Sequence, residues 1–133
     1  MVYGERMSDE STTAQSADGV TAVDRVAVVN AAGEHRFEIT VDDTLAGFAS
    51  YLDVENQRIF FHTVVFDAFG GQGLAGRLVD VAVAETSDAG LRIVPVCPYV
   101  ATWLTRHEEY AGIVDPVSRE SLLAVQAQEE AQQ

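Results

Sequence analysis

The residues with the clearest chemical potential lie between positions 60 and 85, where an apolar segment, a glycine loop and an apolar-periodic helix follow one another. The loop reads Gly70-Gly71-Gln72-Gly73-Leu74-Ala75-Gly76. Glycines let the backbone turn and approach a ligand closely, and the start of a helix leaves several N–H groups unpaired beside a partial positive charge. This order of elements predicts an anion site for a phosphate or pyrophosphate group.

The loop lacks the residues of a nucleoside triphosphate hydrolase. A Walker loop ends in Gly-Lys-Ser/Thr, whereas Leu74 follows Gly73 and the chain contains no lysine. Positions 71–76 do fit the dinucleotide pattern G-x-G-x-x-G, which keeps a nicotinamide dinucleotide reductase as an alternative. That fold requires an acidic residue at the end of a second strand about 20 residues later. Here the next strand ends in Cys97-Pro98 and not in an acidic residue, which disfavours a dinucleotide site.

Further motifs stand on either side of the loop. His62-Thr63 precede it, and Pro95-Val96-Cys97-Pro98-Tyr99-Val100 and Arg106-His107-Glu108-Glu109-Tyr110 follow it. In this order they resemble a small, single-domain branch of the GNAT-type N-acetyltransferase superfamily that has a reduced fold. The resemblance extends over roughly residues 25 to 112. One departure is Gly70, which stands where the superfamily loop usually has Arg or Gln.

The resemblance implies acetyl-CoA as the cosubstrate, bound where the fourth and fifth strands separate. Backbone groups of Val64, Val65 and Phe66 would then hold the pantetheine arm. The pyrophosphate would take the amides of Gly71, Gln72, Gly73, Leu74, Ala75 and Gly76. Arg77, one turn into the helix, either reaches the 3′-phosphate of CoA or pairs on the surface with Asp80.

Three residues are candidates for the catalytic steps. His62 would lie near the thioester and accept the ammonium proton, although a lone strand histidine can equally be a packing residue. Cys97, expected at a helix N-cap, is either an activated thiolate or a small buried hydrophobe. Tyr99 is the nearest phenol for protonating the leaving thiolate. The usual superfamily acid stands two turns into this helix, where the chain has Leu104 and Thr105.

The charge balance narrows the range of partners. Eight arginines and no lysine stand against 21 acidic residues, giving a net charge of −13. Nucleic-acid binding is disfavoured, because it depends on cations that neutralise phosphates. The acidity favours either general solubility in a saline host or an acceptor groove that attracts amines.

Other chemical classes find little support. A single cysteine excludes an internal disulfide and a cysteine-rich zinc site, and His107-Glu108-Glu109 lacks the second histidine of a zinc motif, so no metal is expected. The single cysteine also favours a reducing compartment. No basic and apolar leader or run of 18 apolar residues is found, which predicts no membrane association and a cytoplasmic location. We expect a monomer or a weak dimer.

The elements that must position these residues form one α/β domain. Period-two apolar patterns predict an antiparallel meander of four strands, and helical spacing then predicts a crossover helix, a parallel fifth strand and a second helix. The expected strands are 26–30, 35–41, 45–54, 58–66 and 91–96, and the helices 74–88 and 98–107. We expect a disordered acidic tail over 1–22, an acetyltransferase-like domain over 23–117, and a polar helix or tail over 118–133.

The resemblance thus implies an acetyl-CoA-dependent N-acetyltransferase acting on an amine. The alternative is a non-catalytic CoA-binding or protein-interaction module. This alternative arises because the usual acid is missing and because only residues 31–34 connect the first two strands, where most superfamily members have helices that cover the acceptor site.

Overall fold

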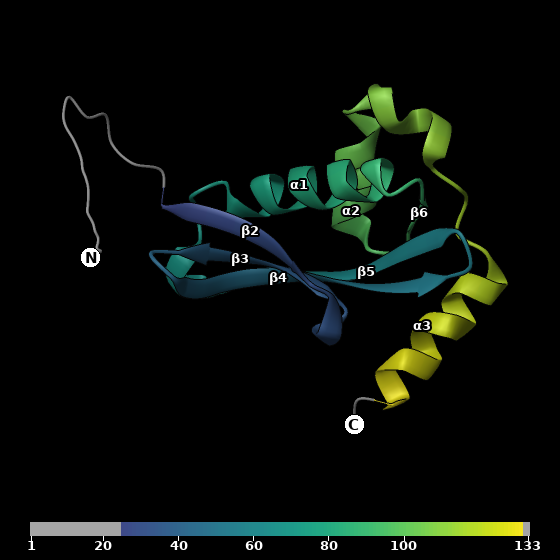
Figure 1. Ribbon diagram of the computed structural model, residues 1–133, viewed down its shortest axis with the longest axis horizontal. Coiled ribbons are helices and arrows are strands. Elements are labelled where there is room, and N and C mark those ends of the chain that lie inside the picture. The colour runs from purple at the N-terminus through teal and green to yellow at the C-terminus, as the bar shows by residue number, and fades with distance from the viewer. Residues whose placement is uncertain (1–24, 132–133) are drawn as a thin grey trace.

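A computed structural model describes residues 25–131, so the expected tail over 1–22 lies outside the described residues. A single five-stranded sheet with the order β2-β3-β4-β5-β6 runs through the molecule (Figure 1). The strands are β2 (Val26–Ala31), β3 (Arg36–Val41), β4 (Thr44–Val54), β5 (Gln57–Val65) and β6 (Arg92–Pro95). The helices are α1 (Leu74–Asp88), α2 (Pro98–Thr105) and α3 (Arg119–Ala131), with 3₁₀ turns η1 (Ala32–Glu34), η2 (Asp67–Phe69) and η3 (Glu108–Ile113).

The order of pairing confirms the predicted α/β fold. β2, β3, β4 and β5 pair antiparallel with their neighbours in sequence, and β6 joins β5 in parallel after the α1 crossover. Asp42 and Asp43 both have positive φ, as a two-residue hairpin turn requires. Only η1 connects β2 to β3, so the described chain has no α-helix at this connection.

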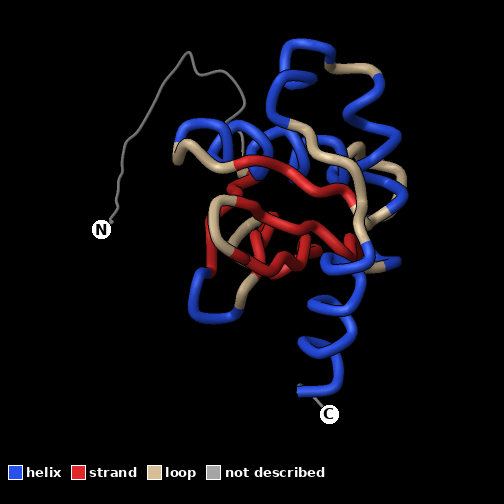
Figure 2. Tube along the Cα trace, turned by 90° about the vertical axis from the view of Figure 1, so that its right-hand side faces the viewer, coloured by secondary structure: helices blue, strands red, loops and turns tan. Residues whose placement is uncertain are grey.

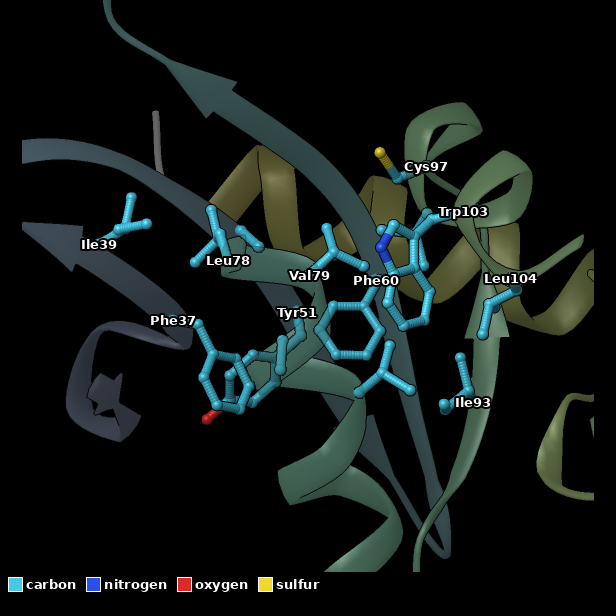
Figure 3. Close-up of a cluster of buried hydrophobic side chains, with 14 of the residues drawn as sticks. Phe37, Ile39, Tyr51, Phe60, Leu78, Val79, Ile93, Cys97, Trp103 and Leu104 are labelled. Atoms are coloured by element: carbon cyan, nitrogen blue, oxygen red, sulfur yellow. The ribbon is translucent and has the colours of Figure 1, made fainter. Parts of the chain in front are cut away.

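The helices lie on the two faces of the sheet. α1 and α2 cover one face and α3 packs against the other, at the end where β4, β5 and β6 meet (Figures 1 and 2). The larger core lies under α1 and α2 and includes the side chains that Figure 3 labels, among them Phe37, Phe60 and Trp103. The smaller core joins Val125 of α3 to Ile59 and Val94. No helix in the described range is long and apolar enough to cross a membrane.

Local signals explain where α1 and α2 begin and end. α1 starts after Gly73, whose φ is +71°, and ends before Gly90, whose φ is +76°. Pro98 opens α2, with Cys97 at the N-cap position. α2 ends at Thr105, two residues before the predicted end, because the amide of His107 donates to the nearer carbonyl of Leu104 and tightens the turn.

The segment after η3 is fastened to the edge of the sheet by Asp115. Its amide donates to the carbonyl of Ile93, and its carboxylate accepts from Arg92 Nε and Gln57 Nε2, each at 2.8 Å. These side-chain bonds, of which that of Arg92 is the stronger, hold the pKa of Asp115 below its usual value. The start of α3 is thereby placed beneath β5 and β6. Ser118 and Ser121 cap its first turn by exchanging backbone-to-side-chain bonds.

Candidate functional site

The glycine loop forms one wall of a pocket of about 420 Å³ between the end of β5 and the start of α1. Its lining residues are Val65, Asp67, Phe69, Gly70, Gly71, Gln72, Gly73, Leu74, Ala75, Gly76 and Tyr99. The six loop residues that the sequence assigned to pyrophosphate therefore share one pocket with Val65 and Tyr99. Cys97, Val64, Phe66 and Arg77 lie outside this lining, and so does His62.

The backbone of the loop leaves a set of donors open to this pocket. The first helical bond of α1 runs from Arg77 N to Gly73 O, so the amides of residues 74–76 precede the helical ladder. Within residues 25–131, no backbone acceptor is recorded for the amides of residues 71–76. Gly71 and Gly73 have φ of +78° and +71°, and a Cβ added at either would meet nothing within 4 Å. The loop therefore needs glycine for its conformation and presents amides where a side chain would otherwise project.

The strand next to the pocket has an edge without a partner. β6 pairs with β5 only as far as Phe60, whose carbonyl accepts a last bond from Cys97 N at 2.8 Å. β5 continues to Val65 in register with β4. Beyond Phe60, the described chain therefore leaves one side of β5 unpaired, which opens a gap between β5 and the start of α2.

Alternation along β5 decides which backbone groups face this gap. Phe66 N donates to Ala46 O at 2.8 Å, so the backbone groups of Phe66 point toward β4. Those of Val64 share that direction, since alternate residues of a strand bond to the same side. The groups of Thr63 and Val65 then point toward the gap. The structure therefore offers Thr63 and Val65 for a ligand, in place of the predicted Val64 and Phe66.

A β-bulge explains the difference. The β4–β5 register shifts between Ser50 and Tyr51, because Phe60 and His62 oppose these two residues and Phe61 is extra. One additional residue exchanges the two faces for every later side chain of the strand. The side chains of His62 and Cys97 therefore lie on opposite faces of the sheet, although their backbones lie on neighbouring segments.

The consequence for His62 is a place on the sheet face opposite α1. It lines a second pocket of about 510 Å³ with Glu34, Arg36, Phe48, Ser50, Phe61 and Glu129. Its ring lies 6.2 Å from that of Phe48, measured between centroids. Thr63, the next residue, points to the other face, where its Oγ1 lies 3.3 Å from the sulfur of Cys97.

Cys97 itself is part of the larger core. It is 4% exposed and packs with residues of α1 and α2 (Figure 3). Its thiol makes no side-chain cap bond at the N-terminus of α2. The only hydrogen-bond partner recorded for the sulfur in the described chain is Thr63, so no imidazole is in place to act as its base.

Tyr99 and Arg77 lie at the two sides of the α1 start. Tyr99 is 42% exposed, and its hydroxyl lies 3.7 Å from the position that a Cβ on Gly76 would occupy. The phenol thus stands beside the glycine loop, within the first pocket. Arg77 is exposed on the first turn of α1, consistent with either of its two predicted roles.

Three residues near the site were not singled out from the sequence. The sequence offered Thr63 only as part of the pair His62-Thr63, and its contact with Cys97 depends on the bulge. Asp67 and Phe69 line the first pocket, and their position directly before Gly70 was an available signal. Within the described range, no three His, Cys, Asp or Glu side chains are grouped as a metal site requires.

Comparisons with known proteins bear on the whole of this region. The model of a family described as GCN5-related N-acetyl-transferase matches residues 36–113, which is more than half of the 133 residues. This range contains both the glycine loop and Cys97. Comparison with curated protein sequences gives no match.

Two solved structures are similar in fold. The solution structure of a GCN5-like candidate N-acetyltransferase from Staphylococcus aureus superposes with a TM-score of 0.55 and 23% identity, over 73% of this chain and 95% of that one. A candidate acetyltransferase of the GNAT family from Desulfovibrio desulfuricans gives a TM-score of 0.39 and 24% identity, over 44% of this chain and 40% of that one. The first supports the fold, and the second is too distant to support an argument.

Proposed function

Because the chain belongs to the GCN5-related N-acetyltransferase family, we propose that it uses acetyl-CoA as the donor and transfers the acetyl group to an amine. The observation that carries this proposal is the 420 Å³ pocket, in which open amides adjoin the unpaired edge of β5. An acyl-CoA has a compact anion joined to an extended amide-bearing arm. A loop of amides beside a free strand edge matches both parts.

The pyrophosphate binds the amides of residues 71–76 at the start of α1, where the helix dipole favours an anion. The pantetheine arm then runs along β5 and pairs with the backbone of Thr63 and Val65. This route leads from the loop toward Cys97 and the end of β6. A dinucleotide has no such arm, so the free edge of β5 favours CoA over the nicotinamide alternative.

The reaction is a direct transfer. His62 takes a proton from the acceptor ammonium, and the amine nitrogen attacks the thioester carbonyl, forming the C–N bond as the C–S bond breaks. The thiolate of CoA leaves and takes up a proton, for which Tyr99 is the one phenol in the lining of the first pocket. The nitrogen loses its second proton to water, and the products are an acetamide and CoA thiol.

The positions of His62 and Thr63 on opposite faces of the sheet support this assignment. The thioester lies at the β5 edge, between Thr63 on one face and His62 on the other, so a base on the second face approaches from the side that the acceptor uses. Cys97 has no base and is buried. It shapes the wall beside the thioester and does not carry the acetyl group.

A charge-bearing substitution in the loop tests the donor site. Gly73→Asp places a carboxylate where the pyrophosphate binds, and we expect CoA affinity to fall by at least about tenfold. Isothermal titration calorimetry with CoA measures the change. Gly90→Asp is the matched control, because Gly90 has a similar positive φ and open surroundings but lies beyond the other end of α1.

Unchanged affinity in folded Gly73→Asp, or an equal loss in Gly90→Asp, would reject the loop as the CoA site. The same preparation distinguishes the enzyme from the alternative of a non-catalytic CoA-binding module. That alternative predicts tight CoA binding without release of CoA from acetyl-CoA in the presence of an amine panel.

A further inference from the structure

The second pocket, on the face opposite α1, is formed by segments far apart in the sequence. Of its lining residues, Glu34 comes from η1, His62 from β5 and Glu129 from the last turn of α3. Glu34 and Glu129 both lie outside residues 36–113, the range of the family match. The pocket therefore depends on segments near both ends of the described chain.

The position of Glu129 follows from the packing of α3. Val125 is 7% exposed and anchors the helix to Ile59 and Val94. Glu129 follows one turn later on the same helix face, since residues four apart share a face. The contact that holds α3 on the sheet thus also directs this carboxylate to the pocket.

The charges of the pocket do not cancel. Of the residues that line the pocket, only Arg36 carries a permanent positive charge. Its Nε donates to Glu38 Oε2 at 2.8 Å. Arg36 also lies over the ring of Phe48, 4.6 Å from its centroid. For the carboxylates of Glu34 and Glu129, no hydrogen bond or ion pair is recorded within residues 25–131. Two carboxylates are therefore open to a positively charged guest.

The other walls suit an alkyl chain between two polar ends. Phe48 and Phe61 supply apolar surface, while Ser50 and the His62 ring supply polar groups near β5. His62 is the lining residue next to Thr63, whose backbone faces the gap at the β5 edge. An amine held against His62 lies close to that edge, and the rest of the molecule extends toward the carboxylates.

We infer that this pocket binds the acceptor and selects an alkyl amine that carries a second positive charge, with Glu34 and Glu129 as the specificity-determining residues. The inference rests on the proposed function, since it names the acceptor class for that reaction. The reacting amine meets His62, and the second ammonium group is bound by the two carboxylates.

The test compares 1,4-diaminobutane with 1-aminobutane, which has the same chain and one charge fewer. Calorimetry on the CoA-saturated full chain measures binding of each amine, and release of CoA from acetyl-CoA measures turnover. We expect the diamine to bind at least about tenfold more tightly than the monoamine. Glu129→Gln and Glu34→Gln should each reduce this preference by about fivefold to tenfold.

Glu130→Gln is the matched control, because it removes one negative charge from the same turn of α3 at a residue outside the pocket lining. It should keep the wild-type preference. Equal binding of the two amines to wild type, or a preference unchanged in both pocket variants, would overturn the inference even if turnover is observed. Selective diamine binding without turnover would support the pocket and instead reject the proposed transfer reaction.

Discussion

At the scale of single residues, the bulge at Phe61 divides the catalytic candidates between two faces of the sheet. His62 lies in the open pocket with Glu34 and Glu129, while Cys97 is buried beside Thr63. A general base must reach the acceptor, and a nucleophilic thiol needs its own base. Only the general base has a suitable residue in place, because His62 lines an open pocket whereas Cys97 has no base beside it.

This arrangement predicts unequal effects of two alanine substitutions. His62→Ala should lower the turnover number by about 10²-fold or more, because a positioned base contributes about 10²–10⁴-fold. Cys97→Ala should retain most of the activity, measured as CoA release under saturating acetyl-CoA. The reverse pattern would indicate an acyl-enzyme.

The acyl-enzyme can also be sought directly. With no lysine in the chain, an acetyl mass gained from acetyl-CoA alone points first to Cys97 or the N-terminal amine. Peptide mass spectrometry of wild type and Cys97→Ala distinguishes these sites. An acetylated Cys97 that disappears on addition of an amine would contradict direct transfer.

At the scale of elements, the free edge of β5 depends on how closely β4 supports that strand. Gly47 in β4 is buried opposite Val65, and a Cβ there would lie 2.3 Å from the carbonyl oxygen of Val64. The atoms that this Cβ would meet all belong to the backbone of β5, so no flexible side chain can move aside. The pairing that holds Val65 beside the glycine loop therefore requires glycine at this position.

Gly47→Ala should force the two strands apart and lower the free energy of unfolding by about 1–3 kcal/mol, the usual cost of overpacking. CoA affinity should fall as well, because Val65 lines the pocket. Urea denaturation and calorimetry measure the two effects. Gly33→Ala, where an added Cβ meets nothing within 4 Å, should change neither. A fully stable Gly47→Ala variant would show that the strands can separate without cost.

At the scale of the whole molecule, the net charge of −13 acts on donor and acceptor in opposite directions. An acidic protein attracts a cationic amine over distance and repels anionic CoA, and salt screens both effects. The backbone amides of residues 71–76, which we propose bind the pyrophosphate, carry no formal charge. The two substrates should therefore respond to ionic strength with opposite signs.

Raising NaCl from about 20 mM to about 500 mM should lower kcat/KM for 1,4-diaminobutane several-fold. Over the same range, the association rate constant of CoA, measured by stopped flow, should increase. Rates for 1-aminobutane should fall less than those for the diamine. A parallel fall for CoA and the diamine would indicate that local ion pairs, rather than the overall charge, govern both associations.

The sequence by itself determined the elements and the position of the glycine loop. Alternation of apolar residues predicted four strands to within one residue of their ends, and Gly73, Gly90 and Pro98 marked where α1 and α2 begin or end. The family was also evident from motifs in order, which the match over residues 36–113 confirms. These features are encoded by neighbours along the chain, so local patterns suffice to reveal them.

Only the tertiary structure decided how the site is assembled. One extra residue at Phe61 moved His62 to the opposite face, and no local pattern marks where a bulge falls, because it depends on the register with β4. The same register turned the backbone of Thr63 and Val65, rather than Val64 and Phe66, toward the gap. Glu34 and Glu129 came together only because α3 packs on the sheet through Val125, a contact between distant segments that periodicity cannot specify.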